Sequence, residues 1–232
     1  MTPEEIDVVI QAYADAAGRA QQAGFDAVQI HGAHGYLISQ FLSPFTNQRT
    51  DAWGGDLDGR RRFLASVCEA VRGRVGPDYP VFIKLGMVDA VEGGLTLEEG
   101  AQVAAALADM KLDAVEISGG ISGGESLNTR PGTRTQADEA YFRPFAQAVR
   151  SRTSLPIALV GGLRSRGVME EVLEAGDADF ISLCRPLICE PHLPNRLRKA
   201  GQERAACISG NRCWPNELGE GISCRCPVER QK

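Results

Sequence analysis

Short apolar runs alternate with longer amphipathic stretches along most of this chain. Runs of strand length lie at Phe25–His31, Pro80–Leu85, Asp113–Ile117, Pro156–Val160 and Phe180–Leu183. They are rich in Val, Ile and Leu, and most of their positions are apolar, which is typical of strands buried on both faces. The pattern predicts five strands of a parallel α/β sheet, each separated from the next by a helix.

The intervening stretches carry helix signals. Thr2 is a predicted N-cap, with Pro3 in the first turn and Glu5 completing a capping box. This helix is expected to run to about Ala23 and to stop at Gly24. A long loop is expected between the first strand and residue 55. Further helices are predicted over 60–74, 96–110, 138–152 and 165–175.

Composition narrows the class of protein. The 232 residues are 43% hydrophobic and 24% charged, as in ordinary soluble globular proteins. The net charge of −5 argues against electrostatic nucleic-acid binding. No stretch approaches the ~20 apolar residues that span a bilayer. Seven cysteines without an export signal favour a reducing cytoplasm, with free thiols or a metal site instead of disulfides.

Three polar side chains follow the first predicted strand. His31 and His34 are three residues apart, and Tyr36 follows after two more. Two imidazoles can donate hydrogen bonds to one oxygen atom, and a phenol can supply a proton. The cluster therefore suits a reaction that polarises a carbonyl and protonates a neighbouring carbon. The alternative is three polar loop residues with no shared target.

The segment from Gly24 to Gly55 reads GFDAVQIHGAHGYLISQFLSPFTNQRTDAWGG. It resembles the Old Yellow Enzyme family of flavin-dependent ene-reductases, and weaker similarity continues to the C-terminus. The resemblance implies a (β/α)8 TIM barrel, which needs eight strands. In that family the His-x-x-His motif lies on the fourth strand, so the chain corresponds to the last five βα units. We expect residues 1–200 to form a partial barrel and residues 201–232 a cysteine-containing tail.

The same resemblance assigns roles to the clustered residues. His31 and His34 are expected to bind the substrate's electron-withdrawing oxygen, and Tyr36 to donate a proton. A hydride then attacks the β-carbon while fixed donors stabilise the enolate. Lys84 matches a cation that faces the flavin pyrimidine ring. Its alternative is a strand-end lysine that reaches solvent.

Two further strand ends resemble the family's flavin phosphate site. Gly161 and Gly162 follow the fourth strand of this chain, and Cys184 and Arg185 follow the fifth. Barrels often hold phosphate at the loops after their last two strands. Glycines let backbone amides approach an anion, and arginine binds it bidentately. We expect FMN as the cofactor and NAD(P)H as the hydride donor.

The tail resembles the iron–sulfur segment of the 2,4-dienoyl-CoA reductase-like members. Cys207, Cys213 and Cys224 match three of the thiolates that a [4Fe–4S] cluster requires, but Gly210 stands at the second position. Cys226 is a conceivable substitute. The alternatives are a remnant that binds nothing and a structural zinc site.

The expected activity is NAD(P)H-dependent reduction of an activated C=C bond in a small alkene or enone. Alternatives are an amine dehydrogenase or demethylase of the same family, and a catalytically silent fragment. The segment 118–124 lacks the histidine found in dienoyl-CoA-reducing subgroups, which argues against that substrate. Unpaired strand edges in an open sheet favour self-association or a partner that completes the barrel.

Overall fold

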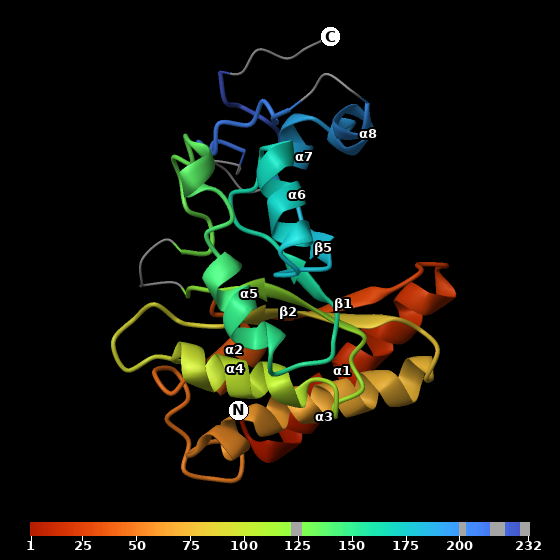
Figure 1. Cartoon of the computed structure of the whole chain (residues 1–232). Helices are drawn as coiled ribbons and strands as arrows, with labels where there is room; N and C mark the ends of the chain where they lie inside the picture. Colours follow the sequence, from red (N-terminus) through yellow and green to blue (C-terminus); the bar gives the residue numbers. More distant parts are fainter. Residues whose placement is uncertain (122–126, 200–202, 214–220, 228–232) are drawn as a thin grey trace.

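The computed structural model describes residues 1–121, 127–199, 203–213 and 221–227. Within these ranges one parallel sheet contains five strands in chain order (Figure 1), which confirms the predicted α/β class. The strands are β1 (Val28–Gly32), β2 (Val81–Gly86), β3 (Ala114–Ser118), β4 (Ile157–Leu159) and β5 (Phe180–Ile181). Adjacent order and parallel direction bring the C-terminal ends of all five strands to one edge of the sheet.

Helices connect successive strands. The structure has α1 (Pro3–Gln22), α2 (Leu37–Leu42), α3 (Leu57–Val75), α4 (Leu97–Ala106), α5 (Arg143–Arg150), α6 (Arg166–Glu174), α7 (Arg185–Cys189) and α8 (Leu193–Arg198), with a 3₁₀ turn at Gln136–Asp138. Figure 1 shows α1, α3 and α4 together on one side of β1 and β2. The Thr2–Glu5 capping box is present at the start of α1, as predicted.

The helices differ from the sequence prediction at several points: α7 and α8 were not predicted, α3 begins three residues earlier than expected, and α2, α4 and α5 also differ. Helix α2 lies inside the predicted long loop, because Leu37, Ile38 and Phe41 form a short apolar face against the core. Helix α4 ends before residue 107. Helix α5 begins only at Arg143, because the segment before it forms the separate 3₁₀ turn.

The core lies between the sheet and these helices. In α3 the buried positions recur every three or four residues, as in an amphipathic helix packed on a sheet. The Phe41 and Phe63 rings stack with centroids 4.3 Å apart and join α2 to α3. Among the described residues, no helix combines the length and apolar character needed to cross a membrane.

The first and last strands leave the sheet open. Within the part of the chain that the structure describes, β1 pairs only with β2 and β5 only with β4. Phe25 and Phe180 beside these edges are 65% and 57% exposed. A groove of about 280 Å³ runs beside β1, lined by Tyr13, Ala16, Ala17, Val28, Gln29, Ile30, His31 and Val71.

Candidate active site

A sharp turn after β1 brings the two histidines together. The strand ends at Gly32, and the backbone then takes the left-handed conformation at His34 (φ 64°) and Gly35 (φ 77°). Few residues other than glycine adopt this conformation, and histidine is among the more tolerant. The turn holds the His31 and His34 ring centroids 5.3 Å apart, nearly edge to face. The histidine pair predicted from the sequence is therefore adjacent in space.

Tyr36 lies beside the same pair. It is the N-cap residue of α2, and its ring centroid is 5.1 Å from that of His31. The side chain is 62% exposed, because it stands at the open β1 side of the sheet. The three side chains form one cluster, and the proton-donor role expected for Tyr36 stays a prediction.

Among the described residues, the His34 side chain makes one hydrogen bond, with the Ser118 hydroxyl at the end of β3. Its Nε2 lies 2.7 Å from Ser118 Oγ. Burial, followed by the nearby positive charge of Lys84, lowers the pKa of His34 to about 4. The same two causes lower the pKa of His31. Both imidazoles are consequently neutral at pH 7, and each has one N–H to donate.

Lys84 is held by a buried carboxylate that sequence reasoning missed. Residues 31, 84 and 116 are aligned across β1, β2 and β3. Lys84 Nζ lies 2.6 Å from Glu116 Oε1, while Gln29 Nε2 donates to Glu116 Oε2 over 2.9 Å. The Glu116 side chain is 8% exposed. Lys84 is therefore fixed and partly neutralised, contrary to the alternative of a lysine that reaches freely into solvent.

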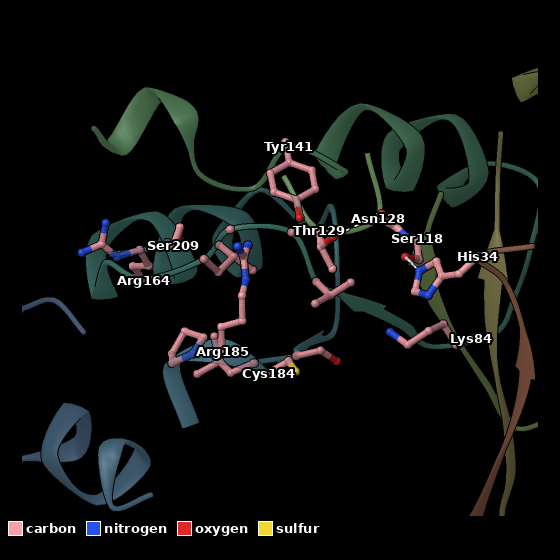
Figure 2. A pocket seen from close by; sticks show the side chains of 17 residues that line it. His34, Lys84, Ser118, Asn128, Thr129, Tyr141, Arg164, Cys184, Arg185 and Ser209 are labelled. Atoms are coloured by element: carbon pink, nitrogen blue, oxygen red, sulfur yellow. Dashed lines mark hydrogen bonds between the residues drawn. The ribbon is translucent and has the colours of Figure 1, made fainter. Parts of the chain in front are cut away.

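One cavity of about 210 Å³ joins His34, Lys84 and Ser118 to the predicted phosphate site. His31 and Tyr36 are not among its lining residues, and His31 lines the groove beside β1 instead. His34, Lys84 and Ser118 lie at one end, and Arg164 and Ser209 lie toward the other (Figure 2). All five predicted cofactor residues line it: Lys84, Gly161, Gly162, Cys184 and Arg185. The cavity is smaller than the ~300–1,000 Å³ of most ligand pockets.

The turn after β4 fits a close approach to an anion. Gly161 and Gly162 have φ of 128° and 71°. A Cβ at Gly162 would lie 3.0 Å from Thr133 Oγ1 and 3.0 Å from the Tyr141 ring, so the position excludes larger residues. Thr133 Oγ1 and Arg164 Nε are buried without a hydrogen-bond partner among the described residues. Of these two residues, Arg164 lines the cavity and Thr133 does not.

Arg185 is positioned by the segment before the 3₁₀ turn and by the tail. Its Nη1 donates to the Arg130 carbonyl over 3.0 Å and to Asn211 Oδ1 over 2.5 Å. Asn211 in turn donates to the Thr129 carbonyl over 2.7 Å. Sequence reasoning missed the cavity residues Asn128, Thr129, Tyr141, Arg164 and Ser209, because no spacing pattern marks them.

The tail thiols lie near one another without forming a ligand set. A Cβ at Gly210 would be 3.1 Å from Cys226 Sγ, so Cys226 stands beside the position where a cysteine was expected. Burial raises the pKa of both Cys207 and Cys213. Within the described ranges, no three His, Cys, Asp or Glu side chains are arranged to hold a metal. The thiols therefore do not fit a cluster as they stand, and the role predicted for Cys207, Cys213 and Cys224 stays a prediction.

Some predictions concern residues outside the described ranges. The segment 118–124 is described only to residue 121, and the predicted tail 201–232 only over 203–213 and 221–227. The described tail packs on the sheet domain: Ser165 and Arg204 form an antiparallel bridge, and Gly132 N donates to the Ser209 carbonyl over 3.0 Å.

Comparison with known proteins finds relatives whose names agree on one class of enzyme, NADH or NADPH oxidoreductases. The chain is 37% identical over 232 residues to an NADH oxidase of Thermoanaerobacter brockii, covering 98% of this chain and 35% of that protein. It is 35% identical to an NADPH dehydrogenase of Geobacillus sp. (strain WCH70), covering 92% and 60%. The chain thus spans between about a third and three fifths of these relatives.

Solved structures agree with the fold. The 2-naphthoyl-CoA reductase complex superposes with a TM-score of 0.78 at 33% identity, covering 85% of this chain and 30% of that one. An Old Yellow Enzyme homologue from Zymomonas mobilis superposes with a TM-score of 0.72 at 29% identity, covering 90% and 56%. These proteins are TIM barrels, so the five βα units are part of such a barrel.

A family model matches residues 1–204, which include every residue predicted for the catalytic cluster and the phosphate site. The chain belongs to the NADH:flavin oxidoreductase / NADH oxidase family.

Proposed function

We propose that this chain forms the catalytic and phosphate-binding part of an FMN-dependent NAD(P)H oxidoreductase that reduces activated C=C bonds. Members of its family use FMN with NAD(P)H as the hydride donor. The observation that carries the proposal is the shared cavity: His34 and Lys84 line the same space as Gly161, Gly162 and Arg185. One elongated ligand with a phosphate at one end and a redox ring at the other matches this arrangement.

Each end of the cavity has its own task. The backbone at Gly161 and Gly162 and the guanidinium of Arg185 hold the phosphate, while Lys84 faces the ring. FMN held by these residues would supply the transfer of hydride from NAD(P)H to the substrate. His31 and His34 donate hydrogen bonds to the substrate oxygen, where negative charge grows during reduction. Tyr36 delivers a proton from its hydroxyl to the adjacent carbon.

A completed barrel is part of the proposal. The groove beside β1 and the exposed Phe180 at β5 leave two edges that the missing βα units can cover. Those units come from further chain or from a partner, and self-association is the alternative. We assign residues 1–200 to the barrel and 201–232 to a tail that braces the phosphate site through Asn211.

The test is to combine the chain with the first three βα units of the related NADPH dehydrogenase and assay the complex. We expect stoichiometric FMN and NAD(P)H oxidation that depends on an added enone such as 2-cyclohexenone. A flavin-free complex, or one that oxidises NAD(P)H equally without enone, would contradict the proposal. The matched control is His31→Ala with His34→Ala, which should keep flavin and lose enone reduction.

Oxidation of amines is a second candidate, favoured by structural similarity. A histamine dehydrogenase from Rhizobium and a 6-hydroxypseudooxynicotine amine oxidase superpose with TM-scores of 0.76 and 0.77 at 28% and 32% identity. Histamine and trimethylamine should be supplied in parallel with the enone, using a dye as electron acceptor. Amine-dependent dye reduction without enone reduction would select this candidate.

A further inference from the structure

Ser118 controls which nitrogen of His34 carries the proton: we infer that its hydroxyl donates to Nε2 and thereby holds His34 in the Nδ1–H form. The inference deepens the proposed function, on which its catalytic consequence rests. Ser118 is then a positioning residue for the substrate's oxygen. The assignment of the proton itself depends only on the contacts around His34.

The partners available to the Ser118 hydroxyl determine the direction of its hydrogen bond with His34. The residue is 1% exposed, so its hydroxyl proton needs a partner inside the protein. His34 Nε2, at 2.7 Å, is the partner that Ser118 Oγ has among the described residues. If Nε2 carried the proton, it would donate to Oγ, and the hydroxyl proton would have no acceptor among the described residues. Leaving a buried donor unpaired is costly, so the reverse direction is preferred.

The charge state of His34 permits Nε2 to accept. Burial and Lys84 together lower the pKa of His34 to about 4, so the imidazole is neutral at pH 7. A neutral imidazole has one N–H and one acceptor nitrogen. With Nε2 accepting from Ser118, the proton must be on Nδ1. Within the described residues Nδ1 makes no hydrogen bond, so its N–H is available to a ligand in the cavity.

This arrangement has a direct chemical consequence. An imidazole donates to an enone oxygen only from the nitrogen that carries the proton. If Ser118 accepted instead, Nδ1 would be an acceptor and would repel the developing enolate oxygen. Fixing the proton before substrate arrives also avoids a rearrangement during the reaction, as expected of preorganised donors. A serine two positions after the Glu116 that holds Lys84 therefore positions a second group at the same end of the cavity.

The tautomer can be read directly in the chain alone. The chain has three histidines, so long-range ¹H–¹⁵N correlation spectra of the uniformly ¹⁵N-labelled protein at pH 7 contain three ring systems. His31→Gln and His34→Gln variants assign them. We expect a pyrrole-type Nδ1 shift and a pyridine-type Nε2 shift for His34. The opposite pattern, or shifts averaged between the two forms, would overturn the inference.

Variants at the serine separate its positioning role from a general structural one. Ser118→Ala should move both His34 shifts toward averaged values while leaving the His192 signals unchanged. Ser118→Thr, which keeps a hydroxyl, should restore them, and Ser182→Ala is a control from the same cavity. Unchanged His34 shifts in folded Ser118→Ala would refute the role of Ser118.

The completed enzyme tests the catalytic consequence. There Ser118→Ala should lower kcat for enone reduction about fivefold to tenfold, the effect of one hydrogen bond between neutral groups, while NAD(P)H-driven flavin reduction stays unchanged. An unchanged kcat for enone reduction would contradict that consequence. Failure of the proposed function would appear as missing enone reduction in every variant. The tautomer of His34 is measured in the chain alone, so that result does not depend on whether the completed enzyme reduces enones.

Discussion

The ion pair between Lys84 and Glu116 offers a sharp test of how the cavity is built. The two residues lie side by side on β2 and β3, with Nζ 2.6 Å from the carboxylate and Gln29 on the other oxygen. Their side chains are 19% and 8% exposed. Lys84→Met keeps the length of the side chain and removes its charge. It should leave the Glu116 carboxylate buried, with Gln29 as its remaining partner.

The burial of the pair sets the expected magnitude. Removing one partner of a buried ion pair costs about 3–5 kcal/mol, because the other charge remains desolvated. Because Lys84 is partly exposed and the Gln29 bond survives, Lys84→Met should cost less than this range, about 2–3 kcal/mol. Glu116→Gln should cost about 1–3 kcal/mol, since a neutral amide still accepts a hydrogen bond from Lys84. The double variant carries no unpaired buried charge and should recover most of the loss.

Urea denaturation followed by far-UV circular dichroism measures the free energy of unfolding of four proteins: the unchanged chain, the two single variants and the double variant. We expect Lys84→Met and Glu116→Gln to be coupled by more than about 1 kcal/mol, with equal m-values across the series. The ion pair Arg152–Glu98 is a matched control, because its side chains are 40% and 61% exposed. Exposed pairs contribute little to stability, because water and salt screen the charges. If the Lys84–Glu116 coupling were as small as that of the control, the reasoning about a fixed, partly neutralised lysine would be refuted.

Three further predictions concern ligands and pH. Purified residues 1–232 should be colourless and should leave the fluorescence of added FMN unchanged at micromolar concentration, because losing roughly half of the flavin's enclosure costs several kcal/mol; a yellow, stoichiometric preparation would contradict this. Anaerobic incubation with iron and sulfide should yield no stable absorbance near ~400 nm, because Gly210 leaves the described thiols without a ligand set; a persistent brown protein with about four irons per chain would show otherwise. The folded pKa of His34, about 4, lies below its ordinary value of 6.5, so between these values the unfolded chain binds the proton that the folded chain excludes. Stability should therefore fall as pH drops from 6.5 toward 4, and His34→Gln should make the fall measured between pH 7 and pH 5 shallower; an equally steep fall in the variant would refute this account of His34.

Sequence patterns predicted the strands well because most positions in these strands are apolar. The Thr2–Glu5 capping box was equally readable, since its hydrogen bonds are local. Helix α2 was missed because six residues give too short a pattern, and its N-cap Tyr36 makes no side-chain cap. Local sequence patterns are therefore sufficient to predict the longer helices and the strands. A short helix such as α2 depends on contacts with the core, which a local pattern does not contain.

In the candidate site, too, some residues were predictable from the sequence and others were not. His31, His34 and Lys84 were found because they stand at strand ends within a recognisable motif. Glu116 and Ser118 were not, because their roles depend on the register that aligns 84 with 116 and on the turn that brings 34 to 118. Contacts across a sheet require knowing which strands are neighbours, and a single sequence gives that only through resemblance to a family.

The two ends of the cavity differ in how far this chain completes them. The end proposed to hold the phosphate is built from the β4 and β5 turns and the tail, with Arg185 held by Asn211 and by the Arg130 carbonyl. The proposed catalytic residues at the other end stand on or after β1, an edge strand whose outer side has no neighbour among the described residues, and Tyr36 beside it is 62% exposed. A hydrogen-bond donor works on a substrate only where water is excluded and its position is fixed. A neighbour for β1 would therefore do more than add flavin contacts, because it would turn the exposed His31–Tyr36 cluster into an enclosed site.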